Sequence, residues 1–209
     1  MPDSAQYYWP QLTGEKHLRI VPNAEHSMAG HIISVLNGVQ EFYVSLMNED
    51  ITRPTYSWTI SQDGGTITLT TSTTKGLLSA KVWMSNNTEA RDWRLITCAE
   101  KSPKCANPVF FRSLNLTETA PGVFSYTHAM PAVGWSAFFI ELEYALNGDD
   151  LFMTVTSDMS IIPKKMPYPP CGIDVCYCGY KCPPNNGAPP ASFNIPTDST
   201  DEHLRKQHD

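Results

Sequence analysis

The sequence predicts a mainly β protein: an all-β sandwich, preceded by a strand, a loop and a helix, and followed by a Cys- and Pro-rich tail. Apolar residues alternate with period 2 between Pro54 and Pro163. Before Pro54 they recur with helical spacing instead. Nine of the 17 prolines fall between Pro163 and Pro196, where no periodic apolar pattern remains. The predicted segments are therefore 1–50, 54–163 and 164–209.

The N-terminal segment contains a predicted strand and helix separated by a loop. Residues 16–21 follow the turn Thr13-Gly14 and are expected to form a short strand. The loop over 22–27 then opens a helix, in which spacings of 4, 3, 4 and 3 place on one face Ile32, Leu36, Val39, Tyr43 and Leu46. Pro54 prevents the helix from continuing. Gly38 lies inside the helix, so we expect the helix to depend on a packing partner.

The segment 54–163 carries the strands. Seven are predicted near 56–62, 66–73, 78–85, 93–98, 109–115, 123–128 and 136–144, and an eighth near 151–159. In the seventh, Phe138, Ile140, Leu142 and Tyr144 alternate with Glu141 and Glu143, a pattern typical of a sheet with one buried face and one wet face. We expect four tryptophans to fill the core rather than bind sugar or peptide: Trp58, Trp83, Trp93 and Trp135.

Composition excludes several classes of protein. The chain has 209 residues, a formal net charge of −6 and a pI near 5.5, which argues against a nucleic-acid partner. No apolar stretch approaches the roughly 18 residues of a membrane span. The sequence contains no phosphate loop, dinucleotide fingerprint or metalloprotease motif, so no cofactor is expected.

Cysteines and sequons favour an oxidising, extracellular compartment. Cys98 and Cys105 bracket six residues and could close a hairpin. Four more cysteines form a cluster in the tail: Cys171, Cys176, Cys178 and Cys182. Their spacing fits disulfides better than the paired knuckles of a zinc site, although their connectivity stays open. Sequons at Asn86 and Asn115 point the same way. No signal peptide follows Met1, so we expect the secretion signal to lie in a missing N-terminal part.

The clearest catalytic candidate is His26, in the string Pro22-Asn-Ala-Glu-His-Ser27 between the predicted strand and helix. A histidine in such a loop can serve as the general base of an α/β-hydrolase, where it takes a proton from a serine. A loop histidine without a special role is the alternative.

Two stretches resemble the PhoPQ-activated pathogenicity-related family, which includes the autocrine proliferation repressor proteins of eukaryotes. They are residues 9–28, which contain the His26 string, and residues 86–94, Asn-Asn-Thr-Glu-Ala-Arg-Asp-Trp-Arg. The resemblance covers about residues 2–160. It implies that 1–50 is the C-terminal remnant of an α/β-hydrolase-like domain and that the sandwich is immunoglobulin-like. It also implies that His26 matches the family's histidine and that Asp3 is a candidate acid.

The sequence departs from this family in having no Gly-x-Ser-x-Gly nucleophile elbow. Without a nucleophile, a triad retains only small residual effects. We therefore expect a secreted, proliferation-repressor-like signalling or binding protein with an extracellular protein partner, in an N-truncated chain without a complete active site. The alternative is a C-terminal fragment of a serine-type hydrolase with His26 as general base.

Overall fold

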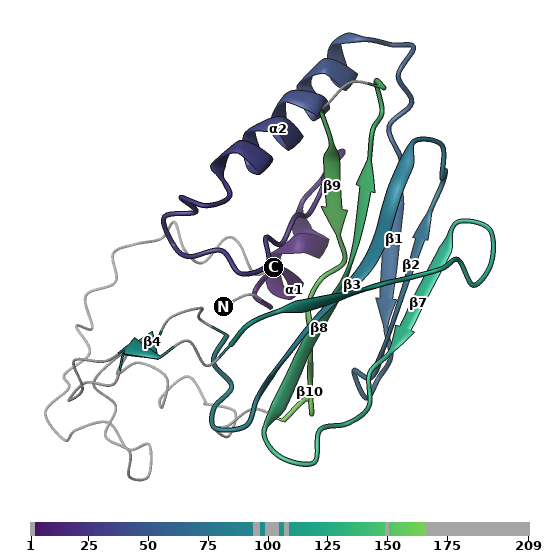
Figure 1. Ribbon diagram of the computed structural model, residues 1–209. Helices are drawn as coiled ribbons and strands as arrows, with labels where there is room; N and C mark the ends of the chain where they lie inside the picture. The colour runs from purple at the N-terminus through teal and green to yellow at the C-terminus, as the bar shows by residue number, and fades with distance from the viewer. Residues whose placement is uncertain (1–2, 94–96, 99–104, 107–108, 149–150, 166–209) are drawn as a thin grey trace, which may run out of the picture. The chain divides into compact units, whose positions relative to one another are not determined.

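The computed structural model describes residues 3–93, 97–98, 105–106, 109–148 and 151–165 (Figure 1). Residues 1–165 form one compact unit. The described part is mainly β and antiparallel, as the sequence predicts. Three helical elements precede the strands: the short α1 (Ala5–Tyr8), the 3₁₀ turn η1 (Trp9–Gln11) and the longer α2 (Ile32–Met47).

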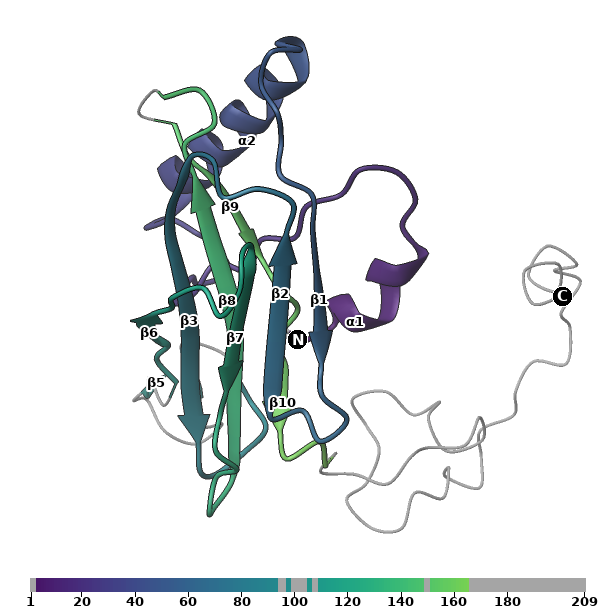
Figure 2. The ribbon, with the colours of Figure 1, turned by 90° about the vertical axis from the view of Figure 1, so that its right-hand side faces the viewer.

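The first sheet has three strands in the order β1-β2-β7, that is Tyr56–Ile60, Thr66–Thr71 and Val123–Thr127. Figure 2 shows β2 lying between its two partners. The turn between β1 and β2 contains Asp63, whose side chain accepts a hydrogen bond from the Gly65 backbone N–H at 2.9 Å. Gly64 has a φ of 82°, a conformation that glycine adopts without steric cost, so this turn closes where the sequence predicts it.

The second sheet follows the order β10-β8-β3-β6, and β9 pairs with β8 as well. Its strands are β3 (Leu77–Asn87), β6 (Arg112–Asn115), β8 (Trp135–Tyr144), β9 (Met153–Thr156) and β10 (Ser160–Ile162). The predicted strand 151–159 is thus divided, because the chain leaves the ladder between Thr156 and Ser160. There the Ser157 hydroxyl accepts a hydrogen bond from the Ile140 backbone N–H at 3.0 Å, so this buried donor still has a partner.

Both sheets contribute to one apolar core. The strand β2 supplies Ile67 and Leu69, β7 supplies Phe124, and β8 supplies the predicted row Phe138, Ile140, Leu142 and Tyr144. The four residues of that row are completely buried. This confirms the period-2 pattern as the signal for the core face.

The other face of β8 is not wet, contrary to expectation. Ala137 and Phe139 on that face belong to a second buried cluster, together with Trp93, Phe111 and Met159. Glu141 is only 8% exposed and accepts a hydrogen bond from the Trp83 indole at 2.9 Å. The alternation failed as a guide here because segments distant in sequence cover this side of the sheet.

Two predicted strands need correction. Residues 16–21 are extended but form no strand. Instead, the segment crosses β9 and β1, where Leu18 O accepts the Thr156 backbone N–H at 2.7 Å and Leu18 N–H donates to the Tyr56 hydroxyl at 2.7 Å. The expected strand 93–98 reduces, in its described residues, to β4 (Thr97–Cys98), which pairs with β5 (Cys105–Ala106).

The helix α2 begins and ends where its apolar spacing predicts, and it lies beside β9 (Figure 1). Its buried residues are polar, however: Glu41 and Ser45. The Glu41 carboxylate accepts the backbone N–H groups of Leu146 and Asn147, at 2.8 and 3.1 Å. A carboxylate holding a strand-connecting loop therefore anchors the helix to the sheets.

Candidate functional site

His26 lies on the loop between the extended segment and α2, in the position that the sequence predicts. Its side chain is exposed, and within the described part of the chain it takes part in no hydrogen bond or ion pair. The neighbouring Ser27 hydroxyl donates to the Glu25 carboxylate at 2.8 Å instead. The imidazole is thus accessible to a reactant, but among the described residues neither an acid nor a nucleophile is hydrogen-bonded to it.

The backbone around His26 is strained. Asn23 has a φ of 57° and Met28 a φ of 53°, and every other positive φ among the described residues belongs to glycine. A non-glycine residue in the left-handed region is costly, most of all one without a short polar side chain. Such strain persists only where surrounding contacts enforce it, and it concentrates at functional sites.

Asn23 supplies the contact that holds this loop. Its amide donates to Phe111 O at 2.9 Å and accepts the Phe111 backbone N–H at 2.7 Å. The side chain therefore imitates one rung of a β ladder. His31 adds a weaker contact of 3.3 Å to Asn23 O. Residue 23 is tied to the sheets, while His26 projects from the loop beyond it.

Asp3, the candidate acid, is buried and 5% exposed. Its carboxylate pairs with the Arg91 guanidinium at 2.5 Å, and the Gln6 amide donates to it at 3.3 Å. Because both partners of the ion pair are nearly buried, the pair fastens the N-terminus to the segment after β3. No contact between Asp3 and His26 occurs among the described residues, so the structure does not assemble the two as an acid–base pair.

A second carboxylate lies near Asp3. Asp158 is 5% exposed, and its Oδ1 accepts the Met159 backbone N–H at 2.8 Å. Burial is the largest cause that raises the pKa of Asp158, and the negative charge of Asp3 adds a smaller increase, so that the pKa is about 6. The Met159 hydrogen bond opposes these effects. No pattern in the sequence singles out Asp158, because only the fold brings it close to Asp3.

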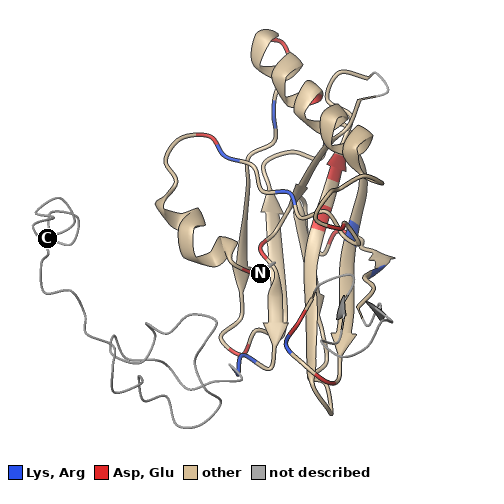
Figure 3. Ribbon diagram, turned by 90° about the vertical axis from the view of Figure 1, so that its left-hand side faces the viewer, with Lys and Arg blue, Asp and Glu red and all other residues tan. Residues whose placement is uncertain are grey.

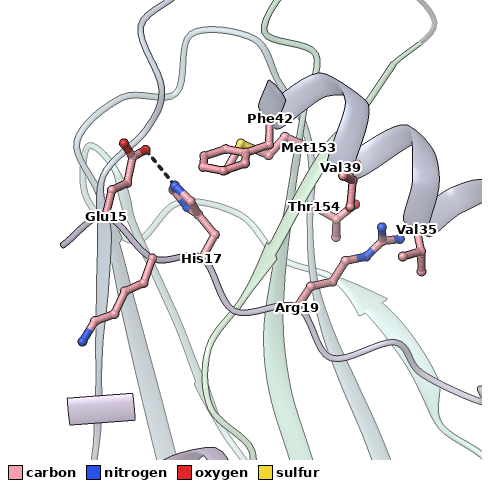
Figure 4. Close-up of a pocket in the computed structure, with 10 residues that line it drawn as sticks. Glu15, His17, Arg19, Val35, Val39, Phe42, Met153 and Thr154 are labelled. Atoms are coloured by element: carbon pink, nitrogen blue, oxygen red, sulfur yellow. Dashed lines mark hydrogen bonds and ion pairs between the residues drawn. The ribbon is translucent and has the colours of Figure 1, made fainter. Parts of the chain in front are cut away.

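A small cavity of about 280 Å³ lies between α2, the extended segment and β9 (Figure 4). Its polar side contains Glu15, His17 and Arg19, and its apolar side contains Val39 and Phe42. Glu15 accepts two hydrogen bonds from Arg53, at 2.7 and 2.9 Å, and contacts His17 Nε2 at 2.9 Å. The bonds from Arg53 and His17 lower the pKa of Glu15 to about 2.

The Glu15–His17 pair has the orientation of a carboxylate–histidine dyad, but among the described residues no group that could react lies at the second ring nitrogen of His17. His17 Nδ1 is buried and has no hydrogen-bond partner in the described structure. The ring packs against Phe42 and Tyr56, with centroids 5.1 and 5.7 Å away. The pair therefore joins the extended segment to α2 and β1. In the sequence, Glu15 and His17 are two positions apart, and this spacing places both side chains on one side of an extended chain.

The disulfide and glycosylation candidates stay predictions. Cys98 and Cys105 are directly opposed in the β4–β5 pairing, the register that a bridge across a hairpin needs. The four tail cysteines lie outside the described residues. Asn86 and Asn115 are both exposed, and the Asn86 side-chain oxygen accepts the Ser136 hydroxyl at 2.6 Å.

Neither a metal site nor a membrane-spanning helix occurs in the described part of the chain. No group of three or more His, Cys, Asp or Glu side chains gathers as a metal site in the parts of the chain that the structure describes. Over the same residues, no helix is long and apolar enough to span a bilayer.

The chain is similar to known proteins by sequence. Residues 1–94 match the model of a family described as PhoPQ-activated pathogenicity-related protein. A relative from Dictyostelium discoideum, autocrine proliferation repressor protein A, is 40% identical over 185 residues. The similarity covers 82% of this chain but only 37% of the relative. No solved structure shows a significant match. The family match and the similarity to the Dictyostelium protein place this chain in the PhoPQ-activated pathogenicity-related family.

Proposed function

We propose that this chain is part of a secreted, proliferation-repressor-like protein and that it acts by binding an extracellular protein, without hydrolysing a substrate by itself. The observation that carries the proposal is the state of the two candidate catalytic residues. His26 is exposed and has no partner within the described residues, while Asp3 is engaged with Arg91. A general base acts only on a group within hydrogen-bond reach. The relative's name supplies the repressor role.

We further infer that the sandwich is immunoglobulin-like. The first two strands pair with each other and with β7, whereas β3 crosses over to pair with β8 in the second sheet. This division supports an immunoglobulin-like sandwich, in which strands A, B, E and D share one sheet and strands C, F and G the other, although no strand of the described three-stranded sheet takes the place of D. Sandwiches of this kind often present sheet faces and loops to protein partners, which supports a binding role by analogy of fold alone.

A proliferation assay tests the binding proposal. Purified chain, produced by a secretory host, is added to growing Dictyostelium discoideum cells beside the His26→Ala variant and heat-unfolded chain. We expect the chain and the variant to slow proliferation equally and the unfolded chain to have no effect. Repression that disappears with His26→Ala would contradict a role through binding, as would a folded chain without effect.

The strained loop favours a second function, hydrolysis by a longer protein that supplies the nucleophile. The left-handed Asn23 and Met28 enclose the segment that presents His26. We expect this chain to show no ester turnover above background, with or without His26→Ala. In the full-length Dictyostelium relative, alanine in place of the aligned histidine should abolish any ester turnover. If that substitution leaves turnover unchanged, the hydrolase proposal is wrong.

A further inference from the structure

The helix α2 has one side with buried polar residues that meets the rest of the fold, and an apolar side that is left exposed. Glu41 and Ser45 are buried, and a Cβ added to Gly38 would lie 3.0 Å from the Arg19 guanidinium and 3.5 Å from Phe152 O, just before β9. Seven large apolar side chains of the helix are between 46% and 71% exposed: Ile32, Ile33, Leu36, Val39, Tyr43, Leu46 and Met47. We call these seven residues the α2 outer face. They include all five residues whose spacing predicted the helix.

The α2 outer face also lacks charge. Between Ile32 and Met47 the only charged residue is Glu41, which is completely buried against the loop that it holds. Figure 3 shows no Lys or Arg along the helix. A helix at a protein surface normally turns charged residues to water, and a helix that is apolar all round belongs to an interior. The α2 outer face therefore has the apolar, uncharged character of a helix face that is covered.

We propose that the α2 outer face packs against the part of a full-length family member that this chain does not match. The similarity to the Dictyostelium relative leaves more than half of that protein unmatched. That length is enough to form a further layer of secondary structure over the α2 outer face. The proposal depends on the exposure and composition of α2 and is independent of the binding role above.

Two other occupants fit the observations less well. A helix of 16 residues is about 24 Å long and about 10 Å wide, so it presents on the order of 250 Å². A stable complex buries about 800 Å² on each partner, so this face alone is too small for a dimer of separate chains. A covalently joined partner gains effective concentration and needs less area. Helices that lie on membranes are rich in Lys and Arg, which α2 lacks.

Cysteine accessibility in the two proteins tests the proposal. Leu36 is 57% exposed, and Leu114 on β6 offers a matched control at 55%. Leu36→Cys and Leu114→Cys are introduced separately into this chain, and cysteine is placed at the aligned positions of the full-length Dictyostelium relative. Alkylation of each new thiol is followed by mass spectrometry of its peptide. Because cysteine is small and both sites are exposed here, neither substitution should prevent folding.

In this chain we expect both thiols to react at similar rates. In the full-length relative, the thiol aligned with Leu36 should react at least ten times more slowly, while the thiol aligned with Leu114 keeps its rate. Equal rates at both positions of the relative would overturn the proposal. Slow labelling of Leu36→Cys in this chain would also overturn the proposal if the rate rose on dilution. That result would identify a second copy of the chain as the occupant. Protection in this chain only by phosphatidylcholine–phosphatidylserine vesicles would overturn it in favour of a membrane.

Discussion

At the scale of single residues, polar side chains that are partly or fully buried explain how the N-terminal segment is held. Asn23 binds both backbone groups of Phe111, and Asp3 pairs with Arg91 across 88 positions of sequence. Buried polar groups need such partners, because an unsatisfied one costs about 1–3 kcal/mol. These contacts therefore fix the route of residues 3–23 over the sheets, in the absence of the strand pairing that the sequence predicted there.

The raised pKa of Asp158 predicts a pH-dependent stability. Its carboxyl binds a proton more tightly in the folded chain than in the unfolded chain. Between the unfolded value near 4 and the folded value of about 6, the folded state therefore holds more protons, and its stability falls as pH rises. Asp158→Asn removes the buried charge and keeps an acceptor for the Met159 N–H.

We expect Asp158→Asn to stabilise the chain at pH 7.5 by on the order of 1–3 kcal/mol and to lose this advantage below about pH 4. Thermal melts across this range measure the effect. The exposed turn residue Asp63 is the control, because hydrogen bonds from Ser61 and Gly65 lower its pKa. Asp63→Asn should give no gain at pH 7.5. A gain from Asp158→Asn that is the same at every pH would contradict the mechanism.

At the scale of elements, α2 shows how a correct periodicity can leave the orientation of a helix open. Apolar spacing located the helix correctly, but it cannot identify the surface that the apolar face meets. The opposite side meets the rest of the fold, where Glu41 binds the loop between β8 and β9 and Phe42 packs against the main core. The position of α2 therefore depends on hydrogen bonds to a loop as well as on the packing of Phe42.

Glu41 is the residue on which this attachment should depend. Glu41→Ala leaves the Leu146 and Asn147 N–H groups without their acceptor, and we expect it to cost about 2–4 kcal/mol of unfolding free energy. Glu41→Gln keeps an acceptor oxygen for both N–H groups, so it should cost less than Glu41→Ala. Urea unfolding of both variants decides this. Equal losses would show that packing, not hydrogen bonding, anchors the helix.

At the scale of the whole molecule, residues 1–50 and the sheets are closely joined. Leu18 bonds to β9 and to Tyr56, and Ile20 packs against the second buried cluster. The division of 1–50 from 54–163 stays a prediction, since the described structure places residues 1–165 in one compact unit.

We expect residues 54–163 expressed alone to melt cooperatively, because the main core is built entirely from strands of that range. They should melt at a lower temperature than residues 1–165, since the fragment lacks the Asn23, Leu18 and Asp3 contacts. Circular dichroism and calorimetry of the two fragments make the comparison. A melt without cooperativity would show that the N-terminal segment is part of the sandwich's own folding unit.

The sequence by itself determined the strands and helix whose apolar periods are long and regular. It located α2, the main core row of β8 and the turn at Asp63, because local spacing and turn chemistry decide these features. It also located the His26 loop and the family. Only the tertiary structure decided that both faces of β8 are buried and that residues 16–21 form no strand. It also showed that Asp3 pairs with Arg91 and that the apolar face of α2 points away from the sheets. These outcomes depend on which distant segments meet, and no local pattern encodes a contact between residues 88 positions apart.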